Sequence, residues 1–160
     1  PKIQNLMGEI AKRLSGIGYT LRSGHADGAD QAFGNYAEKA EIWLPWKSFN
    51  SAKKVAHHTY KVIDPNDKDA YDSLKFHPAA NALKSSVCSL MARNYRQVIG
   101  DDAPNSEFVI CWTSDGKDSG GTGQAIRIAT AHSIPVYNIF NQSECDSLMI
   151  LIGQKENEKY

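Results

Sequence analysis

The chain has 160 residues, which is enough for one domain with a sizeable hydrophobic core. Hydrophobic residues make up 41% of it and charged residues 22%, as in ordinary globular proteins. The 18 basic residues balance the 18 acidic ones, so the composition argues against a general nucleic-acid binder or a membrane-surface binder, which are usually basic.

The cysteines and histidines give no sign of cross-links or metal sites. Cys88, Cys111 and Cys145 are widely spaced and form no CxxC pair, so a disulfide framework or a structural zinc is not expected. Cys111 lies in an apolar run, and we interpret it as a core residue rather than a reactive thiol. The histidines show no metal-ligand spacing, and no bound cofactor is expected. No membrane-spanning run or signal peptide is visible, so we expect a cytoplasmic protein without membrane contact.

The first half of the chain is predicted to alternate helices and strands. Apolar residues at helical spacing predict a helix over 3–15, and two glycines end it. A short strand over 19–23, a helix from Gly28 to Ala40 and a strand over 41–46 are expected to follow. The polar stretch 47–76 is predicted to be an irregular insertion outside the core.

The second half continues this alternation to the end of the chain. The predicted elements are a helix over 78–98, a central strand over 107–112, a helix over 124–132, a strand over 134–139, a helix that Ser143 caps, and a charged, frayed tail over 154–160. This order predicts one domain over 1–160 with an α/β, Rossmann-like fold, in which helices cover both faces of a parallel sheet. Because such domains usually open on a strand, we expect a first strand to precede Pro1.

Two glycine-rich turns each connect a predicted strand to a predicted helix: "SGHADGAD" at 23–30 and "SDGKDSGGTG" at 114–123. In an open α/β sheet, ligands bind beyond the carboxyl ends of the strands. Helix N-termini at this edge offer free N–H groups and partial positive charge. Two such turns therefore favour a phosphate-bearing ligand over purely structural loops, although neither is a Walker loop or a GxGxxG fingerprint.

Several side chains in and near these turns have two interpretations each. Asp27 is interpreted mainly as a helix cap, whereas Asp30 either caps the helix or accepts a hydrogen bond from a ribose hydroxyl. His25 lies within the first turn, where it can contact a ligand.

The stretch "MARNYRQ" places Arg93 and Asn94 beside the buried face of a helix. The arginine either stabilises the helix end or binds a phosphate through its forked guanidinium. Trp46 and Trp112 follow strands, and they either pack at the rim or stack on a base.

The stretches "LRSGHADGAD", "LPWKSFN", "MARN" and "GGTGQAIRIA" resemble, in this order, the SLOG superfamily of Rossmann-like proteins. This superfamily includes the DNA-processing protein DprA, the Lonely Guy phosphoribohydrolases and many small phage-encoded proteins. In the small members the first turn reads SGGAxGAD, and in this chain His25 replaces a glycine of that pattern. The other matching residues are Ser23, Gly24, Ala26, Gly28, Ala29, Asp30, Arg93, Asn94, Gly120, Gly121, Thr122 and Gly123.

The resemblance implies a nucleotide ligand but argues against hydrolysis. The Lonely Guy enzymes carry GGxGTxxE, whose glutamate takes part in cleaving the N-glycosidic bond, and here Gln124 and Arg127 stand at the threonine and glutamate positions. An arginine cannot replace that carboxylate in acid–base chemistry. A divergent hydrolase using Asp30 or Asp27 remains an alternative, as does a DprA-like single-stranded DNA binder, although neutral charge weighs against nucleic acid as a partner.

The predicted function is therefore non-catalytic binding of a nucleotide-derived small molecule. The resemblance suggests sensing or sequestration of an NAD-derived or cyclic nucleotide immune signal, such as cyclic ADP-ribose, by a phage anti-defence sponge inside a bacterial host. A homodimer or higher homo-oligomer is expected. The hypothesis requires both turns to face one crevice. The predicted ligand contacts are Arg22, Ser23, Gly24, His25, Asp27, Gly28, Asp30, Trp46, Arg93, Asn94, Trp112, Gly120, Gly121, Thr122, Gly123 and Gln124.

Overall fold

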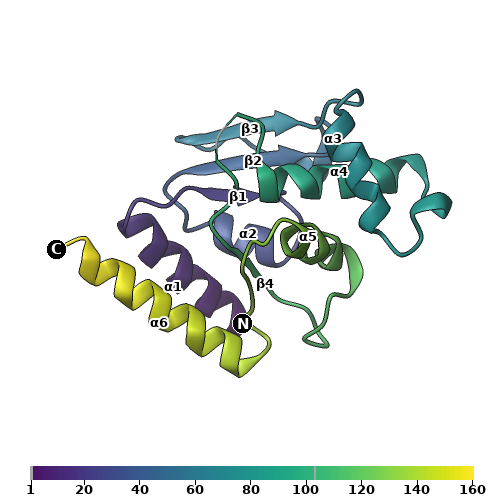
Figure 1. Cartoon of the computed structure of the whole chain (residues 1–160). Helices are drawn as coiled ribbons and strands as arrows, with labels where there is room; N and C mark the ends of the chain where they lie inside the picture. Colours follow the sequence, from purple (N-terminus) through teal and green to yellow (C-terminus); the bar gives the residue numbers. More distant parts are fainter. Residues whose placement is uncertain (1, 103) are drawn as a thin grey trace.

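The computed structural model describes residues 2–102 and 104–160, and it shows helices alternating with strands along the chain (Figure 1). The α-helices are α1 (Lys2–Gly16), α2 (Ala29–Gly34), α3 (Lys68–Asp72), α4 (Ser85–Ile99), α5 (Gly120–Ala131) and α6 (Gln142–Glu158). The strands are β1 (Leu21–Ser23), β2 (Ala40–Leu44), β3 (His58–Val62), β4 (Val109–Cys111) and β5 (Val136–Asn138). The short 3-10 turns are η1 (Phe49–Ser51), η2 (Ser73–Phe76) and η3 (Ala80–Ala82).

All strand pairs of the described residues are parallel. One sheet has the order β1-β2-β3, and a second sheet pairs β4 with β5. In the first sheet Leu21 lies opposite Ala40, and in the second Val109 lies opposite Val136. Helices connect most of these strands, as parallel pairing requires. The predicted α/β, Rossmann-like class, with parallel strands flanked by helices, is confirmed. The single predicted sheet is divided into two, and the strand expected to be central at 107–112 is not central, because β4 pairs only with β5 among the described residues.

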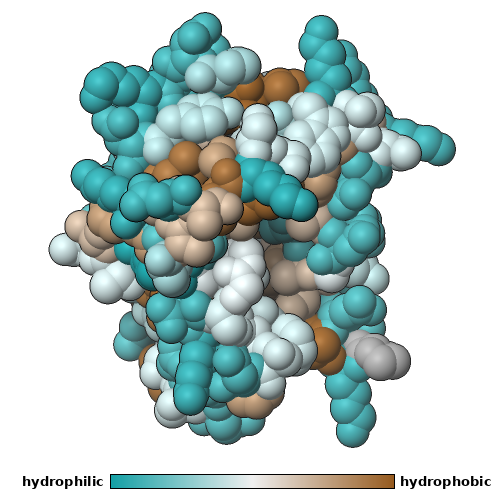
Figure 2. Space-filling model, turned by 90° about the vertical axis from the view of Figure 1, so that its right-hand side faces the viewer, coloured by the Kyte–Doolittle hydropathy of each residue, from teal (hydrophilic) through white to brown (hydrophobic). Residues whose placement is uncertain are grey.

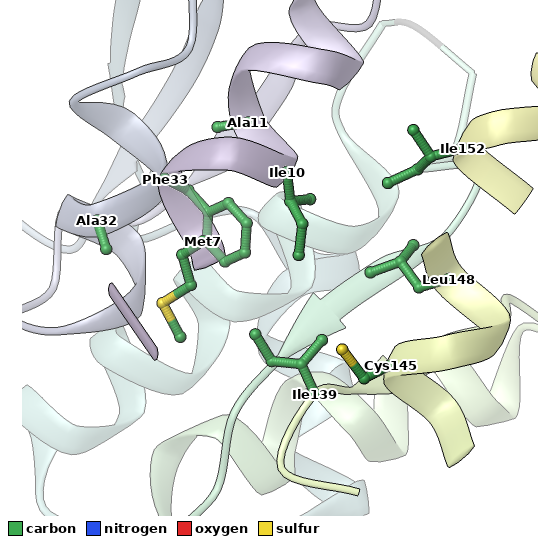
Figure 3. Close-up of a cluster of buried hydrophobic side chains, with 9 residues drawn as sticks. All are labelled: Met7, Ile10, Ala11, Ala32, Phe33, Ile139, Cys145, Leu148 and Ile152. Atoms are coloured by element: carbon green, nitrogen blue, oxygen red, sulfur yellow. The ribbon is translucent and has the colours of Figure 1, made fainter. Parts of the chain in front are cut away.

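The helices form two layers around the strands. One layer consists of α1, α2 and α6, whose apolar side chains meet in one buried cluster (Figure 3). In that close-up Ile10 of α1, Phe33 of α2 and Leu148 of α6 point toward one another. In the other layer, Val98 of α4 and Ile128 of α5 pack against β4 and β5. Several of the apolar positions that predicted these helices, among them Ile10, Phe33 and Leu148, are therefore buried.

Several predicted boundaries are wrong by a few residues. The second helix ends at Gly34 rather than Ala40, because Gly34 and Asn35 are poor helix formers and the chain turns there toward β2. The helix expected over 78–98 begins only at Ser85, after the turn η3. Helix α5 begins four residues earlier than predicted, at Gly120, so glycines of the second turn form its first turn.

The prediction of an irregular insertion over 47–76 is wrong in the middle of that stretch. Residues 58–62 form β3, a parallel strand along β2. Further on, Ile63 and Ala70 are buried together with Ala92 of α4. The sequence pattern concealed the strand because β3 lies at the edge of its sheet and keeps polar, partly exposed side chains.

The predicted frayed tail is also wrong, because α6 continues to Glu158. Asn141 rather than Ser143 occupies its N-cap position. Charged residues attach the last turns to the rest of the molecule. Arg13 of α1 donates two hydrogen bonds to Glu156, at 2.8 and 2.7 Å, so α1 and α6 lie side by side (Figure 1).

Candidate functional site

The first glycine-rich turn leads from β1 into α2 and is organised around a carboxylate of its own. The Oδ2 atom of Asp30 accepts hydrogen bonds from the backbone N–H groups of Gly24, at 3.2 Å, and Ala26, at 3.1 Å. Asp30, for which the sequence left two roles open, therefore holds the turn in shape. These two amides are already paired with a negative charge, so an incoming phosphate would have to bind elsewhere along the turn.

The backbone of this turn takes conformations that side chains disfavour. Gly28, at the N-cap position of α2, has a φ of 91°. His25 has a φ of 56°, in the left-handed region, at the position where the similar motif carries glycine. Asp27 does not cap the helix as interpreted, because its carboxylate accepts from the side chain of Gln31 at 2.9 Å.

The second turn packs closely against the start of α5. A Cβ atom at Gly123 would lie 2.2 Å from the carbonyl oxygen of Asp118, so only glycine fits there. Gln124 is fully buried, and its amide donates to the carbonyl of Ser73 at 3.0 Å. Arg127 donates to the Gln124 side chain and to the Asp118 carbonyl, at 3.2 and 3.1 Å. Gln124 and Arg127 therefore stabilise the second turn through these hydrogen bonds.

Helix α4 runs between the two turns and contacts both. Arg93 donates a hydrogen bond from Nη1 to the carbonyl oxygen of Gly24, in the first turn. Its neighbour Asn94 donates from Nδ2 to the carbonyl oxygen of Gly121, at 3.1 Å, in the second. Two consecutive residues therefore bring together turns that lie far apart in the sequence.

Arg93 is a buried cation that forms no ion pair with an acidic residue in the part of the chain that the structure describes. Its side chain is only 5% exposed, and its Nε atom has no hydrogen-bond partner within the described part of the chain. The guanidinium lies 5.2 Å from the centre of the Phe49 ring and 3.5 Å from the Trp43 carbonyl. The arginines that form ion pairs among the described residues are Arg13, Arg22, Arg96 and Arg127.

This burial has an electrostatic consequence. Removal from water lowers the pKa of Arg93, and the nearby Asp30 carboxylate opposes that shift without forming an ion pair. Burying a charge costs several kcal/mol unless an opposite charge compensates it. The site therefore offers a positive charge that an anion entering it would neutralise.

A cavity of about 780 Å³ lies between the two sheets, and residues of both turns line it. Asp30 borders it on one side and Thr122 on the other, and Arg93 and Asn94 lie between them. The geometry that the nucleotide hypothesis requires, with both turns at one crevice, is therefore present. The predicted ligand contacts that line this cavity are Arg22, Asp30, Arg93, Asn94, Trp112, Gly121 and Thr122.

Other predicted contacts lie elsewhere. Ser23 and His25 line a separate cavity of about 330 Å³, beside α2. Arg22 lines the large cavity, but its guanidinium donates to the Pro104 carbonyl at 2.9 Å and is therefore bound to the loop before β4. Trp46 packs edge-on against Phe49 and lines neither cavity. Gly24, Gly28, Gly120 and Gly123 shape the turns without lining the large cavity.

Sequence reasoning missed two contributors to the site. Phe49 lies under the guanidinium of Arg93, but it belongs to the stretch interpreted as an insertion. Gln97 lies close to Gly24, one turn of α4 beyond Arg93. Its spacing of four residues from Arg93 was the one available indication that both side chains share a helix face.

The face of the molecule on the right of Figure 1, toward which β2 and β3 point, has mixed polarity. Figure 2 shows its hydrophobic areas as small and separated by hydrophilic residues. Trp112 is 37% exposed, packs against Phe140 and lines the large cavity. A partly exposed aromatic ring therefore lines the cavity that Arg93 also lines.

The described residues contain no helix that is long and apolar enough to cross a membrane. Across residues 2–102 and 104–160, no three acidic, histidine or cysteine side chains are grouped so as to hold a metal ion. No protein-family model, curated protein or solved structure matches the chain. The functional argument therefore rests on the site itself.

Proposed function

We propose that this chain binds an anionic, nucleotide-type small molecule in the cavity between the two turns, without converting it. The observation that carries the proposal is the buried guanidinium of Arg93, which lacks an acidic partner among the described residues and lines the cavity that both turns reach. A phosphate is a ligand group that such a forked cation can bind through two parallel, charge-assisted hydrogen bonds.

The other lining residues suit the remaining parts of a nucleotide. Thr122, in the first turn of α5, adds a hydroxyl donor to the cavity that Arg93 lines. Both turn amides donate to Oδ2 of Asp30, which leaves Oδ1 to accept from a ribose hydroxyl. Trp112 offers a partly exposed ring on which a base can stack. Cation, hydroxyl acceptor and aromatic surface thus border one cavity.

Binding without turnover is proposed because the site offers no free carboxylate on α5. Arg127 occupies the position that carries glutamate in the similar hydrolases, and it contacts Gln124 and Asp118. Asp30 accepts two amide hydrogen bonds on one carboxylate oxygen, so it serves the shape of its own turn. Sequestration of an NAD-derived or cyclic nucleotide signal is the specific form of this proposal.

Calorimetric titration of the chain with ADP-ribose, cyclic ADP-ribose, AMP and cyclic dinucleotides tests it. At least one is expected to bind, and Arg93→Gln should weaken that binding about tenfold or more, since charge-assisted hydrogen bonds are worth about 1.5–3 kcal/mol. Arg13→Gln, which removes an arginine paired with Glu156 on another face, serves as the matched control.

Chromatography of the ligand recovered after incubation separates binding from hydrolysis. Intact ligand is expected. A cleaved product would overturn the non-catalytic assignment, and the absence of heat with every ligand would overturn the nucleotide proposal. Equal weakening by Arg93→Gln and Arg13→Gln would remove Arg93 from the site.

A further inference from the structure

The smaller cavity, of about 330 Å³, lies against one face of the first sheet. Its floor is a row of three side chains, Ser23 of β1, Ile42 of β2 and Tyr60 of β3, which lie at the same register of neighbouring parallel strands. Gly34, at the end of α2, also lines it, and so do residues of the segment 51–55. Ligand cavities range from about 300 to 1,000 Å³, so this small cavity suits a small molecule.

Hydrogen bonds hold the walls of the small cavity in place. Asn50 donates from Nδ2 to the carbonyl oxygen of His25, at 3.1 Å, which ties the segment after β2 to the first glycine-rich turn. The Tyr60 hydroxyl donates to the carbonyl oxygen of Lys53, at 2.8 Å, which ties the same segment to β3. The cavity is therefore formed before a ligand arrives, as is usual for small-molecule sites.

Ser23 places a buried hydroxyl without a partner at this cavity. The residue is 1% exposed, and its Oγ atom has no hydrogen-bond partner in residues 2–102 and 104–160. Buried hydroxyl groups are nearly always paired, because an unpaired one loses the hydrogen bonds that it makes in water. Since Ser23 lines the small cavity, a polar ligand there would supply the missing partner.

Backbone strain is concentrated around the same cavity. The described residues with a side chain and a positive φ, between 47° and 65°, are His25, Asn50, Ser51, His57 and Ser133. The first four belong to the turn and the segment that surround the cavity, and His25 and Ser51 line it. A left-handed backbone costs free energy at residues with a Cβ atom, and such residues cluster at binding sites.

The lining is rich in hydrogen-bond donors. Lys53, Ser51 and Ser23 line the cavity, and no hydrogen bond or ion pair within the described part of the chain uses their side chains. Apart from histidines, the charged lining residues are Lys53 and Asp30, and Oδ2 of Asp30 already accepts from two turn amides. One negative charge on a ligand would neutralise Lys53, whereas a second would lie near Asp30 without compensation. Hydroxyl groups both donate and accept, which suits the two serine hydroxyls.

We propose that the small cavity binds a small hydroxycarboxylate, a molecule with one carboxylate and several hydroxyl groups. The carboxylate pairs with the Lys53 ammonium group, and the hydroxyl groups bond to Ser23 and Ser51. The apolar side chains of Ile42 and Val55 border the carbon chain. This inference does not depend on the ligand proposed for the large cavity.

Titration of the whole chain with D-gluconate, followed by NMR of the backbone amides, tests the proposal. Sorbitol has the same carbon chain without the carboxylate, and hexanoate has it without the hydroxyl groups, so these two compounds are the matched controls. Gluconate should shift the amides of Ser51 and Tyr60, and both controls should bind at least about tenfold more weakly, because each lacks one set of hydrogen bonds. No shift of these amides with gluconate, or equal affinity for either control, would overturn the proposal.

Two pairs of variants test the placement of the ligand. Lys53→Gln should weaken gluconate binding about tenfold, whereas Lys54→Gln, at a neighbouring exposed lysine that does not line the cavity, should leave it unchanged. Ser23→Ala should weaken binding about fivefold without lowering the urea midpoint, because its hydroxyl has no partner to lose. Ser73→Ala should do the opposite, because the buried Ser73 donates to the Ala70 carbonyl and lines neither cavity. Equal gluconate affinities within either pair would overturn the placement.

The outcome is separable from that of the nucleotide experiment. No nucleotide enters this titration, and Asp30 is the one lining residue that the two cavities share among the described residues. Gluconate-induced shifts at Trp112 and Thr122, which line the large cavity, in place of those at Ser51 and Tyr60, would overturn the small site. A failure of gluconate binding and a failure of nucleotide binding are therefore distinct results.

Discussion

Replacing Gly24 by alanine tests the contact on which the candidate site depends. A Cβ atom at this position would lie 2.3 Å from Nη1 of Arg93 and 2.8 Å from Oε1 of Gln97. Both distances are below van der Waals contact, and Arg93 is buried and has little space to move aside. The substitution should therefore displace the guanidinium and break its hydrogen bond to the Gly24 carbonyl.

The expected cost follows from these two effects. Overpacking a buried position costs about 1–3 kcal/mol. Loss of a hydrogen bond from a charged donor costs about 1.5–3 kcal/mol, part of which water recovers. We expect Gly24→Ala to lower the free energy of unfolding by about 2–4 kcal/mol. In an Arg93→Ala background the clash with the guanidinium is gone, and only the far end of the flexible Gln97 side chain stays close, so the same change should cost less than about 1 kcal/mol.

Urea denaturation of the two single variants and the double variant, followed by circular dichroism, measures this cycle. Gly153→Ala is the matched control, because a Cβ atom there meets nothing within 4 Å and the site is in the interior of α6. It should stabilise the protein by about 0.5–1 kcal/mol. The reasoning is refuted if Gly24→Ala costs the same, within about 0.5 kcal/mol, with and without Arg93.

Further outcomes follow from individual contacts. Asp30→Ala removes the acceptor of two turn amides and should cost about 2 kcal/mol in urea denaturation, whereas Asp30→Asn, which keeps one acceptor oxygen, should cost less. Hydrogen bonds from Arg96, at 2.6 Å, lower the pKa of Asp67 below 3.8, so the stability that this pair contributes is present above about pH 4 and is lost as the pH falls through the lowered pKa. Asp67→Asn should flatten that part of the profile of urea midpoint against pH. Burial raises the pKa of Cys111 to about 12, so Ellman's reagent at mildly alkaline pH should label the half-buried Cys88 in the native protein and all three thiols only after unfolding.

Each of these predictions can fail in a specific way. Equal destabilisation by Asp30→Ala and Asp30→Asn would show that the acceptor oxygen is unimportant. An unchanged pH profile in Asp67→Asn would mean that the ion pair does not contribute to folding. Rapid labelling of Cys111 in the native state would contradict its place in the core.

Much of the fold could be predicted from local sequence pattern. The apolar spacing in 3–15 and the continuous apolar run around Ile110 predicted α1 and β4, because a local pattern of apolar residues is typical of each element. Met7 and Ile10 of α1 and Cys111 of β4 are buried. The edge strand β3 could not be predicted in this way. Its side chains are partly exposed, and its position depends on pairing with β2 rather than on its own residues.

In the candidate site, too, local features could be predicted from the sequence and contacts between distant segments could not. The two glycine-rich turns and the pair Arg93 and Asn94 were visible in the sequence, because a strand-to-helix turn and a helix face are local features. That Asp30 binds the amides of its own turn was not visible. The choice between capping and ligand contact depends on which neighbour lies closer in the folded chain.

The sequence by itself determined the alternation of helices and strands and the two turns that follow strands. Only the tertiary structure decided that Arg93 is buried with no acidic partner among residues 2–102 and 104–160, and that β1 and β4 border one cavity. The physical reason is that periodicity and turn chemistry act between residues a few positions apart. Burial of a charge and pairing of strand edges depend on segments that meet only when the whole chain folds.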